Sequence, residues 1–169
     1  MFNVFITNLG KYNEGELVGE WVSLPCNDLE AVYERIGIDE EYEEMFITDF
    51  ENDFGYSVGE YESIDELNEL AEELENLDDT EMEELQALLE NGEPINDAIN
   101  MIDDCTMWNG CHDMEDVARE YCEQCGVLDE VPELLQCYFD FDAFGRDMSF
   151  EGTFIFTDSG CVEICRRKG

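Results

Sequence analysis

The sequence predicts an α+β protein that is elongated, with three small domains in a row, and three observations lead to this prediction. Apolar and polar residues alternate near both ends of the chain, which is typical of β-strands. Apolar residues in the middle recur every three or four positions, which is typical of amphipathic helices. The formal net charge is -39 over 169 residues. A DNA duplex with that charge is roughly 65 Å long, whereas a compact globule of this length is only roughly 40 Å wide. An elongated shape keeps such like charges further apart.

Residues 1–61 are predicted to form a small α+β domain with about three antiparallel strands. Residues 2–6 alternate as in a strand, residues 17–24 form a second apolar-rich run, and residues 45–50 a third. Residues 8–15 between the first two runs are rich in turn-forming residue types. A helix capped by Asn27 or Asp28 and ending at Gly37 is expected before the third strand.

Residues 62–103 are predicted to be an all-helical, strongly acidic domain. Between Arg35 and Arg119 there is no lysine or arginine, while 29 of the 83 intervening residues are Asp or Glu. Ser63 and Glu66 have the spacing of a capping box, which opens a helix to about residue 75. A second helix is expected from about residue 80 to the Asn-Gly pair at 91–92, and a third from Pro94 to about residue 100. Because leucines interleave with the acids, we expect helices with a charged outer face rather than a disordered tail.

Residues 104–169 are predicted to be a second α+β domain. Asp113 caps a helix that ends near Gly126, and Pro132 starts another that extends to about Ala143. Residues 148–150 and 153–156 are expected to be strands, and residues 161–164 complete a hairpin through a turn at 158–160.

The charge and the absence of targeting signals limit the function classes. A strongly negative field repels nucleic acid and membrane surfaces and attracts basic partners. The N-terminal residues lack a basic region and a sustained apolar run, so we expect no signal peptide. No stretch of about 18 apolar residues is present, so we expect no membrane span. The eight cysteines are then expected to be reduced thiols in a cytoplasmic protein.

One segment resembles a calcium-binding loop in part. Residues 140–151 carry acids at the first and third positions, glycine at the sixth and glutamate at the twelfth. However, Phe144 and Met148 occupy positions that should supply ligands, so we do not expect a specific calcium site.

Zinc binding and catalysis have little support either. The sequence contains residue types that bind zinc, but a second cysteine pair at zinc-finger spacing is absent. Buried structural thiols are therefore the preferred interpretation. The residues considered for a zinc site are Cys105, Cys111, His112, Cys122 and Cys125. There is one histidine and no phosphate-binding or dinucleotide-binding motif, and with 46 acidic residues paired carboxylates arise by chance. We therefore expect a protein that is not an enzyme and has no cofactor or metal.

Two further groups of residues leave alternatives open. The aromatic residues Tyr138, Phe139, Phe141 and Phe144 are either core residues or the centre of an interface, where aromatic residues are enriched. The three consecutive basic residues 166–168 are expected either to be a frayed tail or to pair with an acidic neighbour.

Three sequence blocks resemble one protein family. Residues 8–19, with the sequence Asn-Leu-Gly-Lys-Tyr-Asn-Glu-Gly-Glu-Leu-Val-Gly, resemble the start of the ArdA antirestriction proteins of plasmids and conjugative transposons. Residues 113–121 are similar to a further block of that family. Residues 138–147, followed by 152–155, resemble the antirestriction motif of the family and the segment after it. The blocks occur in order across nearly the whole chain, with the weakest coverage at about residues 91–110. The cysteines after residue 104 and the basic C-terminus are departures that leave the thiol state open.

The resemblance implies a homodimeric mimic of bent B-form DNA. Such a protein occupies the DNA-binding groove of type I restriction-modification enzymes, blocks cleavage and modification of incoming DNA, and binds no nucleic acid itself. The resemblance also implies a dimer contact in the C-terminal domain near the motif, which consists of Tyr138, Phe139, Asp140, Phe141, Asp142, Ala143, Phe144, Gly145, Arg146 and Asp147. The candidate DNA-mimicking carboxylates are Glu60, Glu62, Asp65, Glu66, Glu69, Glu72, Glu73, Glu75, Asp78, Asp79, Glu81, Glu83, Glu84, Asp113, Glu115 and Asp116.

Three other functions fit the composition. An acidic protein that binds calcium or basic proteins would give saturable binding heats. A halophilic protein without a partner would unfold below molar salt. A small redox or zinc enzyme would be detected by metal analysis and thiol counting.

Overall fold

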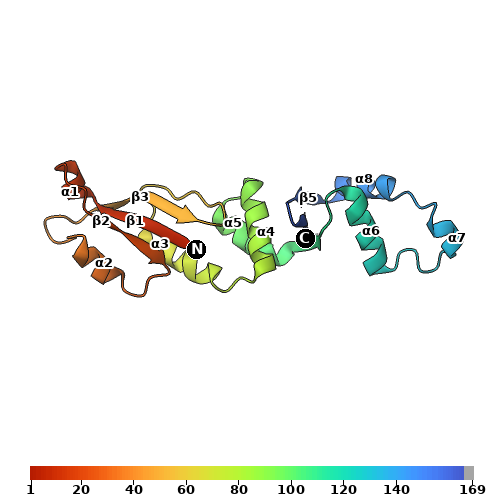
Figure 1. The fold of residues 1–169 in the computed structure, drawn as a ribbon, viewed down its shortest axis with the longest axis horizontal. Helices are drawn as coiled ribbons and strands as arrows, with labels where there is room; N and C mark the ends of the chain where they lie inside the picture. Colours follow the sequence, from red (N-terminus) through yellow and green to blue (C-terminus); the bar gives the residue numbers. More distant parts are fainter. Residues whose placement is uncertain (166–169) are drawn as a thin grey trace. The chain divides into compact units, whose positions relative to one another are not determined.

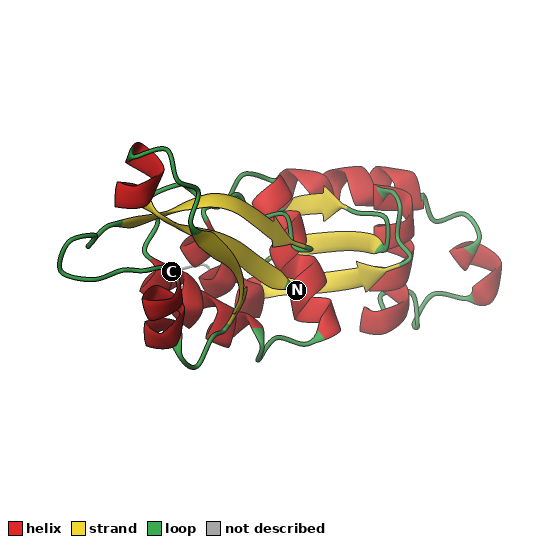
Figure 2. Ribbon diagram, turned by 60° about the vertical axis from the view of Figure 1, so that its left-hand side comes forward, coloured by secondary structure: helices red, strands yellow, loops and turns green. Residues whose placement is uncertain are grey.

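A computed structural model describes residues 1–165, so the expected basic tail at 166–168 lies outside the described residues. The chain divides into two compact units, the first comprising Met1–Asp78 and the second beginning at Asp79. The described residues form eight α-helices and two three-stranded antiparallel sheets, which confirms the α+β class. Figure 2 shows these strands and helices. The elongated arrangement of three domains stays a prediction.

The first unit is built on a sheet with strand order β2-β1-β3 (Figure 1). The strands are β1 (Phe2–Asn8), β2 (Gly19–Leu24) and β3 (Met45–Asn52), close to the three predicted runs. Val4 and Ile6 of β1 are fully buried, as the alternating pattern requires. The three-stranded antiparallel prediction is therefore confirmed.

Two helices connect these strands. Helix α2 (Leu29–Arg35) begins after Asp28, whose side chain accepts a hydrogen bond from the Ala31 backbone N–H at 3.0 Å. This helix was predicted. Helix α1 (Leu9–Asn13) was not, because the sequence there suggested only a turn. The side chain of Asn8 caps α1 by accepting a hydrogen bond from the Lys11 N–H at 3.0 Å.

Helix α3 (Ile64–Leu74) packs against β2. The predicted cap is present, since the Ser63 hydroxyl accepts a hydrogen bond from the Glu66 N–H at 3.3 Å. The buried face of the helix consists of Ile64, Leu67, Leu70, Ala71 and Leu74. The amphipathic prediction is confirmed.

The second unit begins with the other two predicted helices. Helix α4 (Asp79–Glu90) ends before Gly92, whose φ of 93° belongs to the left-handed region that favours glycine. Helix α5 (Ile95–Met101) follows Pro94 and leads into the short 3-10 helix η1 (Ile102–Asp104). Leu85 and Leu88 of α4 are fully buried, and the helix contacts strands of the second sheet.

The second sheet has the strand order β4-β6-β5. Its strands are β4 (Cys105–Asn109), β5 (Thr153–Phe156) and β6 (Gly160–Ile164). The hairpin formed by β5 and β6 was predicted. Strand β4 was not, although its pairing with β6 completes the sheet.

The helices near the end of the chain differ from the prediction at one place. Helix α6 (Met114–Cys125) is capped by Asp113 and ends at Gly126, as expected. The single helix expected from Pro132 to about Ala143 is wrong, because the chain forms α7 (Glu133–Gln136) and then α8 (Phe141–Glu151). Asp140 starts the second helix by accepting a hydrogen bond from the Ala143 N–H at 2.9 Å. The strand expected at 148–150 is also wrong, since these residues belong to α8.

Candidate functional site

Helix α3 displays the most regular group of carboxylates in the first unit. Its exposed acidic residues are Asp65, Glu66, Glu69, Glu72 and Glu73. Residues three or four apart on a helix have Cβ atoms about 5–6 Å apart, and the helix contains no lysine or arginine. Like charges at this spacing repel one another, so the buried leucine face has to hold the helix in place.

The other predicted carboxylates of the first unit are not equivalent. Glu60, Glu75 and Asp78 are exposed. Glu62 is half-buried and accepts hydrogen bonds from the Tyr56 hydroxyl at 2.6 Å and from the Gly59 N–H at 2.9 Å. Burial and this contact with Glu62 raise the pKa of Tyr56. Glu62 therefore stabilises its own loop rather than standing free.

The predicted carboxylates on α4 also differ in exposure. Asp79 is exposed, whereas Glu81 and Glu83 are half-buried. A carboxylate oxygen of Glu83 accepts a hydrogen bond from the Ser159 hydroxyl at 2.8 Å. Glu84 is only 5% exposed, so its carboxylate is not displayed.

The start of α6 carries the remaining predicted carboxylates. Asp113 and Glu115 are exposed, and Asp116 is half-buried. Asp113 accepts a hydrogen bond from the Asp116 N–H at 2.9 Å, and Asp116 accepts one from the His112 N–H at 3.1 Å. Acids in the first turn favour the helix through its dipole. In all, eleven of the sixteen predicted carboxylates are exposed.

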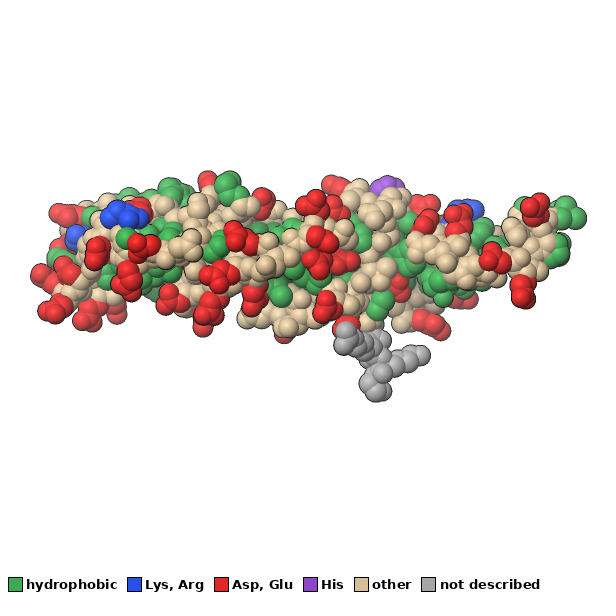
Figure 3. All heavy atoms as spheres, turned by 90° about the horizontal axis from the view of Figure 1, so that it is seen from below, with side chains coloured by type: hydrophobic (Ala, Val, Ile, Leu, Met, Phe, Trp, Pro, Cys, Tyr) green, Lys and Arg blue, Asp and Glu red, His purple; other side chains and the backbone are tan. Residues whose placement is uncertain are grey.

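The four basic side chains of the described residues each lie close to a group of their own unit. Arg35 binds Glu20 and holds the pKa of that carboxyl below its usual value through a side-chain hydrogen bond. Arg119 pairs with Glu115 and Arg146 with Asp142, each one helical turn apart. Lys11 Nζ lies 5.6 Å from the centroid of the Tyr42 ring. Figure 3 shows acidic side chains all along the visible face and basic ones in few places.

The predicted antirestriction motif forms the start of α8 and the turn before it. The rings of Phe139 and Phe141 lie 4.9 Å apart, and those of Phe139 and Phe144 lie 5.6 Å apart. Phe144 in turn lies 6.1 Å from the Tyr121 ring of α6. The guanidinium of Arg119 lies 4.3 Å from the centroid of Phe141, within cation–π range. These three phenylalanines thus join α6 to α8.

Gly145 allows the two helices to approach closely. It is the buried residue of α8, and a Cβ atom at this position would clash with the backbone oxygen of Met114. The outward side of the motif differs, because Tyr138 is 80% exposed and Asp142, Arg146 and Asp147 are exposed as well. The motif therefore has an inward aromatic side and an outward polar side with one free aromatic ring.

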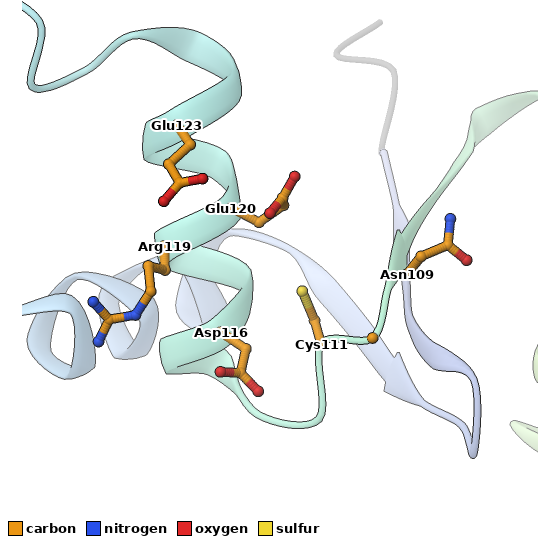
Figure 4. A pocket seen from close by; sticks show the side chains of 7 residues that line it. Asn109, Cys111, Asp116, Arg119, Glu120 and Glu123 are labelled. Carbon is orange, nitrogen blue, oxygen red and sulfur yellow. The ribbon is translucent and has the colours of Figure 1, made fainter.

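A recess of about 180 Å³ lies between β4 and α6 (Figure 4). Asp116, Arg119, Glu120 and Glu123 of α6 line it, and Cys111 lines the other side with two neighbouring residues. Burial raises the pKa of the Cys111 thiol, and the nearby carboxylates of Asp116 and Glu120 raise it further. A thiol that stays protonated is a poor nucleophile and a poor metal ligand, so the recess offers little for catalysis.

The segments considered for metals have other roles. Residues 141–151 form helix α8, which does not have the loop conformation that calcium ligation needs. Cys111 and Cys122 are buried, whereas Cys125 is exposed and Cys105 half-buried, so Cys122 and Cys125 do not share an environment. Within residues 1–165, no group of three or more His, Cys, Asp or Glu side chains is placed to hold a metal ion.

The model of one protein family matches residues 4–163 of the chain, a range that extends from β1 into β6; the family is described as antirestriction protein (ArdA). The chain belongs to the ArdA family of antirestriction proteins. A comparison with curated proteins found no match. Membership of this family implies an antirestriction function. The matched range includes residues 91–110, where the sequence resemblance was weakest. In the part of the chain that the structure describes, no helix is both long and apolar enough to cross a membrane.

Proposed function

We propose that this ArdA protein is a mimic of B-form DNA that occupies the DNA-binding groove of a type I restriction-modification enzyme in the cytoplasm. In this role it blocks cleavage and modification of incoming DNA, performs no reaction of its own and binds no nucleic acid. The observation that carries the proposal is the acidic face of α3, where five exposed carboxylates lie on one helix that contains no lysine or arginine.

The physical argument concerns the phosphate contacts of the enzyme. DNA-binding proteins gain most of their sequence-independent affinity from lysine and arginine contacts with phosphates. Carboxylates at a spacing of about 5–6 Å on a helix can meet those cations and cannot be cleaved or methylated as DNA is. Base edges carry the sequence information, and phosphate contacts do not. A mimic of phosphates should therefore inhibit enzymes of different sequence specificity.

The exposed carboxylates supply this surface in our proposal. In the first unit they are Glu60, Asp65, Glu66, Glu69, Glu72, Glu73, Glu75 and Asp78; in the second they are Asp79, Asp113 and Glu115. We leave Glu84 out because it is buried. The half-buried Glu62, Glu81, Glu83 and Asp116 contribute to the field around this surface more than to direct contacts.

We also propose a homodimer with its contact at the antirestriction motif. Tyr138 is 80% exposed, and Leu134 and Leu135 just before it are 77% and 55% exposed. Neighbouring apolar side chains in this number are typical of an interface rather than of a free surface. We expect a second copy of the chain to cover these side chains.

Competition between the purified protein and a labelled duplex for a type I enzyme tests the proposed mimicry. We expect displacement of the duplex, inhibition of both nuclease and methyltransferase activities, and a strong loss of inhibition as salt rises, because screening weakens contacts between exposed charges. Displacement that does not change between low and high salt would contradict the electrostatic basis of the proposal. Inhibition without displacement of the duplex would contradict binding in the DNA groove.

A further inference from the structure

The outer face of the first sheet carries a row of exposed and half-buried side chains that the proposed carboxylate surface does not include. Val4 and Ile6 of β1 point into the core, so Phe5 between them lies on the opposite face. The strand register pairs Phe5 with Trp21 on one side and with Asp49 on the other. Paired residues in antiparallel strands share a face. Trp21, Phe5 and Asp49 therefore form one row across all three strands.

A second aromatic group continues this face towards β3. A register shift at Phe5 and Ile6 places Phe46 opposite Thr7, on the same side as Phe5. The Tyr12 ring of α1 lies 5.2 Å from the Phe46 ring, and Tyr61 stacks on Phe46 at 6.2 Å with an interplanar angle of 22°. We call Tyr12, Trp21 and Tyr61, with Phe5 and Phe46 beneath them, the aromatic face.

The aromatic face is open to solvent. Trp21 is 45% exposed, Tyr12 50% and Tyr61 74%. Phe5 and Trp21 meet edge to face at 5.5 Å and 74°, which fixes the indole in position. A backbone hydrogen bond from the Ile47 N–H to the Glu60 carbonyl oxygen at 2.8 Å connects the residue before Tyr61 to β3.

The charged side chains of the three strands that carry the aromatic face are all acidic. Asp49, Glu51 and Glu60 are exposed beside it, and the three strands contain no lysine or arginine. Both basic side chains of this unit are directed elsewhere, Arg35 to Glu20 and Lys11 to the Tyr42 ring. No cation of the unit covers the exposed rings.

Exposed aromatic rings beside carboxylates favour one chemical class of binding partner over another. Aromatic side chains on an open sheet often stack on nucleic-acid bases, but such surfaces also need basic residues along the phosphate backbone. Here the carboxylates would repel phosphates. Aromatic ring faces attract cations, and the planar guanidinium of arginine both stacks on a ring and pairs with a carboxylate.

We propose that the aromatic face receives arginine side chains of the enzyme that this protein inhibits, with the guanidinium stacked on Trp21 or Tyr61 and paired with Asp49 or Glu60. This proposal rests on the proposed inhibition of a DNA-binding enzyme. It adds a contact that resembles the stacking of arginine on bases, whereas the carboxylates resemble phosphates.

Substitution of Trp21 in the full chain tests the proposal in the competition assay with a type I enzyme and labelled duplex. Trp21→Thr keeps a residue that favours strands and should weaken inhibition about 2- to 30-fold, the range of one cation–π contact. Because no carboxylate is lost, the dependence of inhibition on salt should stay as in the wild type. Trp21→Phe should restore most of the affinity, and Trp21→Leu should not, since leucine is apolar but has no ring.

Phe156→Thr is the matched control, because Phe156 is 42% exposed and also lies in a strand, in the other unit. It should inhibit like the wild type. The proposal is overturned if Trp21→Thr inhibits as strongly as the wild type, if Trp21→Leu binds as well as Trp21→Phe, or if the wild type binds labelled single-stranded DNA through this face. If the wild type itself fails to displace the duplex, the proposed function fails, which is a separate result.

Discussion

Neutralising part of α3 should weaken binding to the enzyme and at the same time stabilise the protein. The triple substitution of Glu69, Glu72 and Glu73 by Gln removes three exposed carboxylates and keeps their length. One exposed ion pair contributes about 0.2–1 kcal/mol, so the loss of three should weaken inhibition by about 3- to 150-fold. Within the trio, Glu69 repels Glu72 and Glu73 across one helical turn. Glu69 also lies within one turn of Asp65 and Glu66, so the three substitutions remove all four like-charged pairs of the helix, which should raise the free energy of unfolding by about 0.8–2 kcal/mol.

The two opposite effects are measured separately. Fluorescence anisotropy of a labelled duplex bound to a purified type I enzyme gives the affinity of the competitor, and urea unfolding gives the stability. The matched control is the triple substitution of Glu40, Glu43 and Glu44 by Gln, which changes the net charge equally at exposed positions outside the proposed surface. If the control weakens inhibition as much as the α3 variant, net charge alone acts and the surface of α3 has no special role. If the α3 variant is destabilised, its weaker inhibition cannot be assigned to lost contacts.

Two further outcomes are expected from the second unit. Tyr138→Ser should weaken a homodimer about 30-fold or more if Tyr138 is a central contact, while Phe150→Ser, at a residue 81% exposed outside the motif, should leave it unchanged; light scattering over a concentration series measures both, and a monomeric wild type would refute the dimer. Burial, with the neighbouring Cys111 thiol, raises the pKa of Cys161 from 9.0 to about 12. Its contribution to stability is therefore fully present below pH 9 and is lost as the pH rises through about 12. Unfolding midpoints from pH 8 to pH 11 should fall less in Cys161→Ser than in the wild type, and an equal fall in both would refute this linkage.

Local sequence signals predicted an element correctly where all the features that define the element lie within its own segment. Helix α3 has its cap, its apolar spacing and its acidic face within twelve residues, and it was predicted correctly. Helix α8 was not, because a short apolar group at residues 148–150 fits a strand as well as a helix. Met148 is on the same helix face as Phe144 and packs against the cluster around Trp108. That contact decides in favour of the helix, and no local pattern contains it.

Tertiary pairing also explains what was missed near the proposed sites. Strand β4 is an edge strand of five residues that exists because β6 pairs with it. The burial of Glu84, one residue after the half-buried Glu83, depends on which side of α4 meets the sheet. The aromatic face could not be predicted either, because Phe5, Phe46 and Tyr61 come together only through the strand register and the Ile47–Glu60 hydrogen bond.

Helix α3 can have an acidic face that contains no cations, because burial of its apolar side chains contributes more free energy than the repulsion between its carboxylates costs. Four large aliphatic residues of α3 are buried, namely Ile64, Leu67, Leu70 and Leu74. Burial of such side chains contributes about 1.5–3 kcal/mol each, hence about 6–12 kcal/mol as an upper estimate. Helix α3 contains four like-charged pairs at three- and four-residue spacing. Together their repulsion costs about 0.8–2 kcal/mol. The helix can therefore hold carboxylates without internal counterions, which leaves them available for the cations of another protein.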